Sequence, residues 1–347
     1  MQTSTQSDTA AKPIMTVRDF KVGFATREGV IPAVDGVDLE LYPGEVLALV
    51  GESGSGKSAM SMGFVGLNRG RRTRIEGSVD FAGRDLVAAS EREMRDVRGR
   101  DIAVVFQDAL AALNPLKRVG DQVVEMIRQH QRVSKSEARA MAIDLLREVG
   151  IARPEQNFSA YPHEYSGGMR QRAMIAIALA NDPRVLIADE PTTALDVTIQ
   201  AQILDLLKRL QSEHGTSIIL VTHDLGVVAG IADRVAVMYS GRIVEIGPRD
   251  EVLYNAQHPY TQGLMASTPK ISSAVPDLLP AIPGAPPLGA QRPQGCSFSP
   301  RCAFAHDKCR EAPTLESRDG EGHRTACWLG ETVPVGSTAS VRVMGEA

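Results

Sequence analysis

Aromatic residues make up only 4% of this 347-residue chain, which holds a single Trp and no excess of basic side chains. Its 38 Lys and Arg against 42 Asp and Glu give a net charge of −4. A chain with this balance creates no electrostatic field that gathers polyanions. Nucleic acid is therefore not the partner that the composition favours.

Long apolar segments are also missing. The longest uninterrupted apolar run, 173–180, has eight residues, whereas a membrane-spanning helix needs about 18 or more. The first twelve residues are rich in Thr, Ser and Gln and lack the apolar core of a secretory signal. We therefore expect a cytoplasmic protein that does not cross a membrane by itself.

Cysteine is scarce as well, because all four Cys lie between Cys296 and Cys327. So few thiols in a cytoplasmic chain of this length do not suggest a disulfide scaffold. The spacing Cys296-x5-Cys302-x6-Cys309-x17-Cys327 lacks the Cys-x2-Cys pair of most structural zinc sites. Four Cys also match the ligand count of an iron–sulfur cluster. An iron–sulfur cluster, a zinc ion and unligated thiols are thus three open interpretations.

From Met15 to about Asp250, short β-branched runs alternate with longer helical patterns, which predicts an α/β domain with a largely parallel sheet. The expected strands are 46–50, 102–106, 185–188, 217–221 and 234–239. The segments 35–41 and 77–81 alternate polar and apolar residues, which predicts a smaller antiparallel β subdomain.

A helical subdomain is inserted at about 108–180. Within it, Ser134 and Glu137 form a capping box before an apolar stripe, and Gly150 supplies a helix stop. We assign 13–255 to the main domain and 256–347 to a small C-terminal region. That region holds a Pro-rich linker, 276–293, and the Cys site, 296–327.

The strongest chemical signal is Gly51-Glu52-Ser53-Gly54-Ser55-Gly56-Lys57-Ser58, a complete G-x-x-x-x-G-K-S phosphate loop after the first expected strand. Its glycines let successive N–H groups turn toward a phosphate, and the following helix adds its positive N-terminal end. We expect Lys57 at the β- and γ-phosphates of a nucleotide and the Ser58 hydroxyl at Mg²⁺. This segment predicts a P-loop NTPase.

Two further segments fit that prediction. The apolar strand 185–188 leads into Asp189 and Glu190. In a P-loop NTPase the first acid reaches Mg²⁺ beside the phosphate loop, and the second is placed to activate the attacking water. A turn of small residues, Ser166-Gly167-Gly168, opens another expected helix and makes a second anion-binding helix start.

Six motifs follow one another along the chain: the phosphate loop, Gln107, Ser166-Gly167-Gly168-Met169-Arg170-Gln171, Asp189-Glu190, Ala194-Leu195-Asp196 and His223. In this order they resemble the nucleotide-binding subunit of an ATP-binding cassette (ABC) transporter. The resemblance covers roughly the first three-quarters of the chain. Tyr161-Pro162-His163-Glu164, His258-Pro259-Tyr260-Thr261 and the terminal cysteines further resemble the dipeptide, oligopeptide and nickel importer branch.

This resemblance implies that two such domains close face to face around two ATP molecules, each held between one phosphate loop and the other subunit's signature turn. The implied nucleotide ligands are Gly51, Ser53, Gly54, Ser55, Gly56, Lys57, Ser58 and Phe24 as an adenine stack, with Ser166, Gly167, Gly168 and Gln171 serving the partner's nucleotide. Phe24 as a plain core residue is the alternative. The implied catalytic residues are Glu190, His223 and Gln107. The implied Mg²⁺ ligands are Ser58, Gln107 and Asp189, and Asp196 is the implied residue of the dimer interface.

For the C-terminal cysteines, the resemblance implies a four-iron four-sulfur cluster, which some members of the importer branch carry at Cys296, Cys302, Cys309 and Cys327. The implied function is ATP-driven import of short peptides, with nickel or another small solute as alternative cargo. The implied partners are a second homologous ATPase subunit in a heterodimer, two transmembrane permeases and an extracytoplasmic binding protein. The chain would then lie at the cytoplasmic face of the membrane.

Two other functions stay open. Soluble cassette ATPases that act on nucleic acid or ribosomes resemble this chain less, because they carry a long coiled-coil insertion or two cassettes. Here 59 positions separate Gln107 from Ser166 (166 − 107), and there is one cassette. A regulatory nucleotide switch is the second alternative, against which the intact Glu190 and His223 argue.

Overall fold

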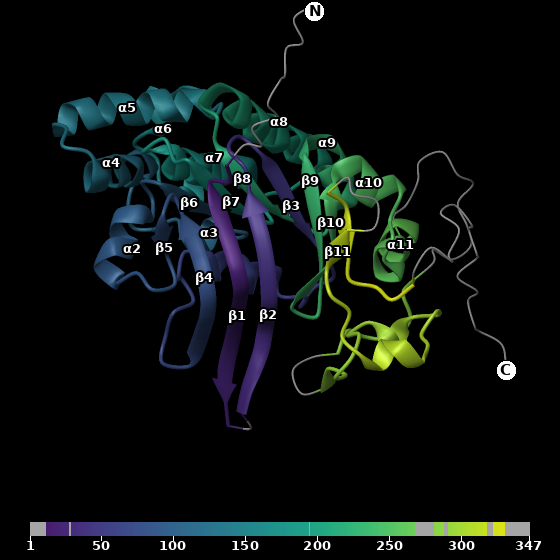
Figure 1. Ribbon diagram of the computed structural model, residues 1–347. Coiled ribbons are helices and arrows are strands. Elements are labelled where there is room, and N and C mark those ends of the chain that lie inside the picture. Colours follow the sequence, from purple (N-terminus) through teal and green to yellow (C-terminus); the bar gives the residue numbers. More distant parts are fainter. Residues whose placement is uncertain are drawn as a thin grey trace, which may run out of the picture.

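The computed structural model describes residues 12–27, 29–193, 195–267, 281–287, 291–317 and 322–329. An eight-stranded sheet with the strand order β11-β12-β10-β9-β3-β8-β7-β6 forms its centre. A four-stranded antiparallel sheet, ordered β2-β1-β4-β5, carries the long strands that extend away from the helices in Figure 1. The predicted α/β class with a separate antiparallel β subdomain is therefore confirmed.

The central sheet consists of β3 (Val46–Val50), β6 (Ile102–Val105), β7 (Val185–Asp189), β8 (Ser217–Val221), β9 (Arg234–Tyr239), β10 (Arg242–Pro248), β11 (Glu316–Ser317) and β12 (Arg324–Thr325). The antiparallel sheet consists of β1 (Met15–Thr26), β2 (Gly29–Leu41), β4 (Thr73–Phe81) and β5 (Arg84–Asp85). All five expected central strands are present. Two bounds differ, since β6 ends one residue earlier and β7 includes Asp189.

The strands β6, β7, β8, β3 and β9 pair in parallel. Every residue of β3, β7 and β8 is buried, which explains their nearly continuous apolar sequences. In parallel strands the carboxyl ends lie at one edge of the sheet, and ligand sites form there. This edge receives the segments that follow Val50, Asp189 and Val221.

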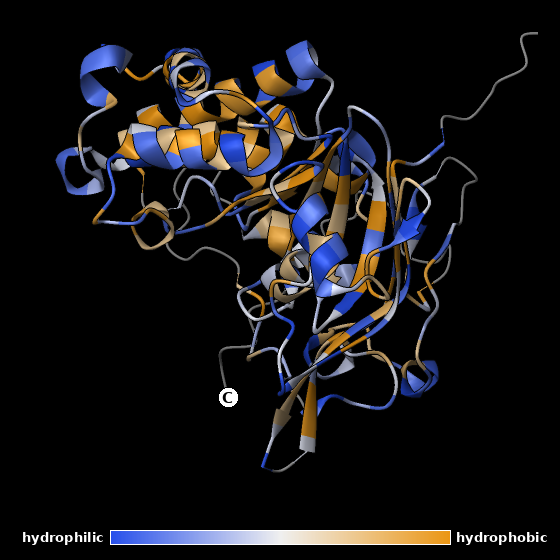
Figure 2. Ribbon diagram, turned by 90° about the vertical axis from the view of Figure 1, so that its left-hand side faces the viewer, coloured by the Kyte–Doolittle hydropathy of each residue, from blue (hydrophilic) through white to orange (hydrophobic). Residues whose placement is uncertain are grey.

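The helices are α1 (Lys57–Phe64), α2 (Glu91–Val97), α3 (Ala109–Ala112), α4 (Val119–His130), α5 (Lys135–Glu148), α6 (Pro154–Asn157), α7 (Gly167–Leu179), α8 (Val197–His214), α9 (Leu225–Ile231), α10 (Arg249–Tyr254) and α11 (Pro259–Ala266). Helices α4, α5 and α7 share a buried apolar cluster with β6, β7, β8 and α8. Figure 2 shows apolar residues concentrated in the strands and between the stacked helices. Among the described residues, no helix is both long enough and apolar enough to span a bilayer.

The C-terminal region packs against the main domain. Its short strands β11 and β12 extend the central sheet beyond β10 (Figure 1). His323 beside β12 places Nε2 2.8 Å from Glu245 of β10, and both side chains are fully buried. Of the predicted Pro-rich linker, 276–280 and 288–290 lie outside the described residues, whereas 281–287 form neither helix nor strand.

Helix α5 begins at the predicted capping box. The Ser134 N–H donates to the Glu137 carboxylate at 2.8 Å, and the Glu137 N–H donates to the Ser134 hydroxyl at 3.2 Å. The helix ends before Gly150, whose φ of +80° favours glycine.

We expect Ser134→Ala to lower the free energy of unfolding by about 0.5–2 kcal/mol, because the Glu137 N–H in the first turn loses the hydroxyl that caps it. Urea titration followed by circular dichroism measures this loss. Ser136→Ala is the control, since Ser136 is an exposed residue of the same first turn. Equal stability of the two variants would contradict the capping role.

Candidate active site

The phosphate loop occupies the turn between β3 and α1 and needs glycine at two close approaches. A Cβ on Gly51 would lie 2.2 Å from the Met238 carbonyl oxygen, and one on Gly56 would lie 2.4 Å from that of Ala33. Both residues also have positive φ, +151° and +106°. The loop is therefore wedged between β9 and β2 with its backbone shape fixed.

Lys57 is the first residue of α1 and is 5% exposed. Its ammonium donates to the carbonyl oxygens of Gly51 at 2.8 Å and Glu52 at 3.0 Å. Burial lowers the pKa of Lys57, and the nearby acids Glu190, Asp189 and Glu52 oppose that shift. The geometry keeps a cation directly over the loop.

Asp189, the last residue of β7, meets the loop through Ser58. The Ser58 hydroxyl donates to an Asp189 carboxylate oxygen at 2.9 Å. Burial raises the pKa of Asp189, whereas this hydrogen bond lowers it. A hydroxyl and a carboxylate oxygen at this spacing are the hard oxygen donors that Mg²⁺ prefers.

Glu190 is the point on which three side chains converge. Gln107 Nε2 and the Thr193 hydroxyl donate to Glu190 Oε2 at 2.8 and 2.9 Å. His223 Nδ1 lies 3.3 Å from Oε1 of the same carboxylate. Glu190 also has a φ of +46°, a conformation that is rare for non-glycine residues and concentrates at functional sites.

The structure thus brings together Gln107, Glu190 and His223, whose grouping the sequence predicts through its motifs. Thr193 is an additional contact that the sequence analysis does not assign. Thr193 follows Glu190 by three residues in the sequence, and this spacing could have indicated the contact. In the structure the Thr193 N–H donates to the Glu190 carbonyl oxygen at 3.2 Å and closes a turn.

A cleft of about 650 Å³ joins these groups. Its lining combines the phosphate loop with the converging side chains: Ala33, Ser53, Gly54, Gly56, Lys57, Ser58, Ala59, Gln107, Glu190, Thr193 and His223. A buried cation, loop N–H groups and oxygen donors suit a nucleoside triphosphate with Mg²⁺. The residues present therefore fit the predicted ligand.

The signature turn lies elsewhere on the surface. Ser166 is the N-cap of α7, accepting a hydrogen bond from the Met169 N–H at 3.3 Å, and both Ser166 and Gly167 are exposed. Neither residue, nor Gly168, is among the described residues that line the cleft. Gln171, which we expected to serve the partner's nucleotide, is instead only 4% exposed and points into the protein.

Asp196 is the exposed N-cap of α8 and accepts a hydrogen bond from the Ile199 N–H at 3.0 Å. The next residue, Val197, is an apolar side chain with 82% exposure. Phe24 lies on β1, opposite Ile31 of β2, and is 37% exposed. The alternative of Phe24 as a core residue is therefore wrong, and it is not among the described residues of the cleft lining.

The four cysteines form no disulfide, and each is half-buried. Burial raises the pKa of Cys302 to about 11, and the proximity of Cys327, Cys296 and Cys309 adds to this shift. Among the described residues, no three of these thiols lie within 4.8 Å of one another. The cluster, the zinc ion and the unligated thiols therefore all stay open as interpretations.

Known families match both parts of the chain. Residues 34–193 match the ABC transporter family, and residues 244–309 match the family described as the C-terminal region of oligopeptide/dipeptide transporters. The oligopeptide transport ATP-binding protein OppD of Bacillus subtilis is 49% identical over 91% of this chain and 88% of its own. The dipeptide transport ATP-binding protein DppD of the same organism is 46% identical, with 91% and 94% covered.

Solved structures agree. The ATP-binding cassette MJ0796, a dimer bound to ADP and Pi, is 30% identical with a TM-score of 0.62, and 68% of this chain and 98% of that chain are covered. The chain belongs to the oligopeptide/dipeptide family of ABC transporter ATP-binding proteins.

Proposed function

We propose that this protein is the ATPase subunit that powers the import of short peptides through a membrane ABC transporter. The observation that carries the proposal is the Glu190 carboxylate, which Gln107, Thr193 and His223 surround at the edge of the phosphate-loop cleft. Support for a peptide cargo comes from the matched C-terminal region and from relatives named for oligopeptides and dipeptides. Nickel or another small solute has no comparable support.

The loop N–H groups and Lys57 bind the phosphates, with Lys57 turning from the loop carbonyls to the β- and γ-phosphate oxygens. Ser58, Asp189 and Gln107 would hold Mg²⁺, which would supply positive charge that neutralises the phosphate oxygens. Glu190 accepts the proton of the attacking water as the water oxygen bonds to the γ-phosphorus. The bond from that phosphorus to the bridging oxygen breaks, and ADP leaves with the electron pair. His223 contacts the γ-phosphate, while Thr193 and Gln107 keep the Glu190 carboxylate oriented. The exposed Phe24 stacks on the adenine.

The second half of each ATP site comes from another subunit. Ser166, Gly167 and Gly168 form an exposed helix start outside the cleft of their own chain, so they serve the nucleotide of the partner. The exposed Asp196 and Val197 contribute to the same interface. Gln171, being buried, supports the turn from behind. The partner is a homologous ATPase subunit encoded as a different chain.

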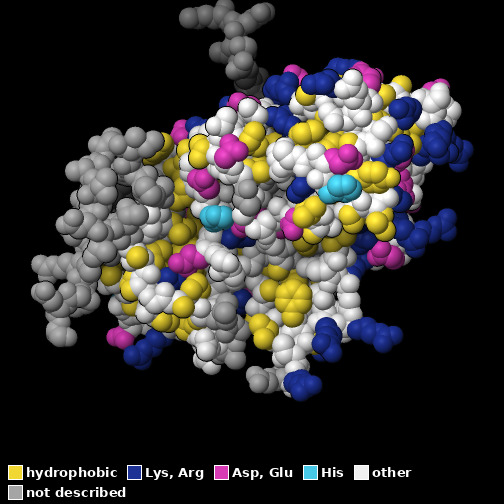
Figure 3. Space-filling model, turned by 180° about the vertical axis from the view of Figure 1, so that it is seen from behind, with side chains coloured by type: hydrophobic (Ala, Val, Ile, Leu, Met, Phe, Trp, Pro, Cys, Tyr) yellow, Lys and Arg dark blue, Asp and Glu magenta, His cyan; other side chains and the backbone are white. Residues whose placement is uncertain are grey.

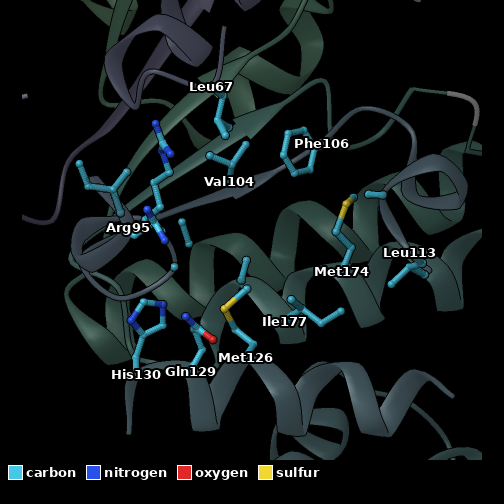
Figure 4. A pocket seen from close by; sticks show the side chains of 16 residues that line it. Leu67, Arg95, Val104, Phe106, Leu113, Met126, Gln129, His130, Met174 and Ile177 are labelled. Carbon is cyan, nitrogen blue, oxygen red and sulfur yellow. The ribbon is translucent and has the colours of Figure 1, made fainter. Parts of the chain in front are cut away.

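A groove between β6 and the helical subdomain is the contact for the membrane subunits. It has a volume of about 400 Å³ and a largely apolar lining. Phe106 and Leu67 face Met174, Ile177 and Met126 of α7 and α4 across it (Figure 4). Phe106 directly precedes Gln107, so a permease segment in this groove senses the catalytic centre. The subunit is thereby peripheral to the cytoplasmic face of the membrane, and an extracytoplasmic binding protein delivers the peptide.

The surface charge does not favour the alternative of a nucleic-acid or ribosome ATPase. On the face in Figure 3, acidic side chains lie scattered among the basic ones. Nucleic-acid surfaces instead gather Lys and Arg in one patch or stripe. The net charge of −4 points the same way.

We expect Glu190→Gln to lower ATP hydrolysis by the assembled transporter about 10²- to 10⁴-fold, because the neutral amide cannot take the proton of water. ATP binding should persist, since the phosphate loop is intact. Phosphate release measures hydrolysis, and calorimetry measures ATP binding. Glu213→Gln, an exposed change on α8, is the control. Unchanged turnover in Glu190→Gln would remove this residue from its role.

We also propose that Cys296, Cys302, Cys309 and Cys327 hold a four-iron four-sulfur cluster. Their proximity supports this assignment, because each thiol contributes to the electrostatics of Cys302. The cluster would stabilise a region that has little apolar surface of its own.

Anaerobically purified protein should contain iron and absorb broadly in the visible, because thiolate-to-iron charge transfer lies there. Cys302→Ser should lose both the iron and the colour. Ala303→Ser is the matched control, because it adds a hydroxyl at the exposed neighbour and keeps every thiol. Wild-type protein without iron in anaerobic preparations would refute the cluster.

A further inference from the structure

Glu52, the second residue of the phosphate loop, is bonded at every one of its polar groups. Its backbone N–H donates to the Tyr260 hydroxyl at 2.8 Å. Its carbonyl oxygen accepts from Lys57 Nζ at 3.0 Å and from the Ser55 N–H at 3.2 Å. Its carboxylate forms a two-point ion pair with Arg301, at 2.7 and 3.0 Å.

Two of these partners come from the chain beyond the nucleotide motifs. Tyr260 lies on α11 and is fully buried, and its ring packs at a tilt against those of Tyr239 and Phe298. Burial raises the pKa of Tyr260, so its hydroxyl stays neutral. Arg301 ends a short 3₁₀ helix directly before Cys302, and only 5% of its side chain is exposed.

Arg301 is itself held in place. Its guanidinium donates to the carbonyl oxygens of Pro283 at 2.8 Å and Ile282 at 3.3 Å, besides both oxygens of Glu52. A planar guanidinium bound at two points fixes the orientation of a carboxylate as well as its charge. The C-terminal region therefore grips the loop at one residue.

These contacts become more important when a nucleotide binds, because Lys57 then gives up its hydrogen bonds to the loop. The Lys57 ammonium here bonds the carbonyl oxygens of Gly51 and Glu52, and those bonds are lost when it turns to phosphate oxygens. The bonds from Tyr260 and Arg301 are then the external contacts that hold Glu52. Arg301 also neutralises a carboxylate that would otherwise stand beside a polyphosphate and repel it.

We infer that Tyr260 and Arg301 are positioning residues for ATP binding, through which the folded C-terminal region preorganises the phosphate loop at Glu52. This inference rests on the proposed binding of ATP by that loop. It makes ATP affinity depend on a region that contributes no residue to the described cleft lining. The substrate touches neither side chain, so their effect is on affinity and not on the chemical step.

The most specific test is Tyr260→Phe in the full-length chain, with Mg²⁺–ATP affinity measured by calorimetry. This change removes one hydroxyl and no charge from a buried ring. Loss of one hydrogen bond that holds the loop should raise the Kd about 3- to 10-fold. Tyr42→Phe is the control, because its hydroxyl bonds Glu40 at 3.0 Å, away from the loop, and its Kd should equal that of wild type.

A second variant tests the ion pair. Arg301→Met should raise the Kd about 10- to 100-fold, within the usual range of coupling between sites, whereas the control Arg310→Met should not, since that side chain is 86% exposed. The Kd of Arg301→Lys should lie between those of wild type and Arg301→Met, because lysine keeps the charge and loses the two-point geometry. Adding Glu52→Gln to Arg301→Met should recover part of the affinity by removing the unpaired carboxylate.

In the assembled transporter, Tyr260→Phe should raise the KM for ATP and leave kcat unchanged, a split that loss of folded protein would not produce. The inference would be overturned if Tyr260→Phe and Arg301→Met both bound ATP with a Kd within twofold of the wild-type value. Wild-type protein that binds no ATP, or Lys57→Ala that binds it normally, would instead overturn the proposed function. The two failures are therefore distinguishable.

Discussion

Parallel pairing of β3, β8 and β7 is the constraint on which the site depends. The register sets Leu49 beside Val221 and Val221 beside Asp189, so the three strands finish at the same edge of the sheet. The phosphate loop, Asp189–Glu190 and His223 begin where these strands end, although up to 172 positions separate them (223 − 51). Burial of both sheet faces fixes the register, because a slip would leave clashes and cavities in the packed core on either side. The catalytic geometry is thus a consequence of core packing.

The same sheet also fastens the C-terminal region to the nucleotide side of the molecule. Strand β12 adds to β10, the buried His323–Glu245 pair holds that addition, and the aromatic cluster of Tyr239, Tyr260 and Phe298 lies close by. From this platform Arg301 reaches Glu52. The Cys site is therefore one residue away from a side chain that contacts the phosphate loop. The inferred role of Arg301 thus makes the shape of the loop depend on the folding of the cysteine region.

The sequence predicts the features that depend on local spacing. It does not predict a single contact between two residues that lie far apart along the chain. The phosphate loop, the strands 46–50 and 217–221 and the capping box of α5 follow from motifs or periodicity within a few residues. The contact between Arg301 and Glu52 spans 249 positions and leaves no periodic signal. The same holds for the addition of β12 to the sheet. Gln171 was assigned by its motif, but its place on α7 turns it inward, which the motif alone does not encode.

We propose that each chain contributes to two ATP sites, giving its phosphate-loop cleft to one and its outward-facing signature turn to the other. The most direct measurement is ATP affinity of the isolated Ser166→Arg subunit, together with ATP hydrolysis after its assembly into the transporter. The account predicts wild-type affinity in the isolated subunit and loss of hydrolysis in the assembly, because the added bulk blocks closure against the partner's nucleotide. Loss of ATP affinity in the isolated subunit would place the signature turn at its own nucleotide and contradict the account.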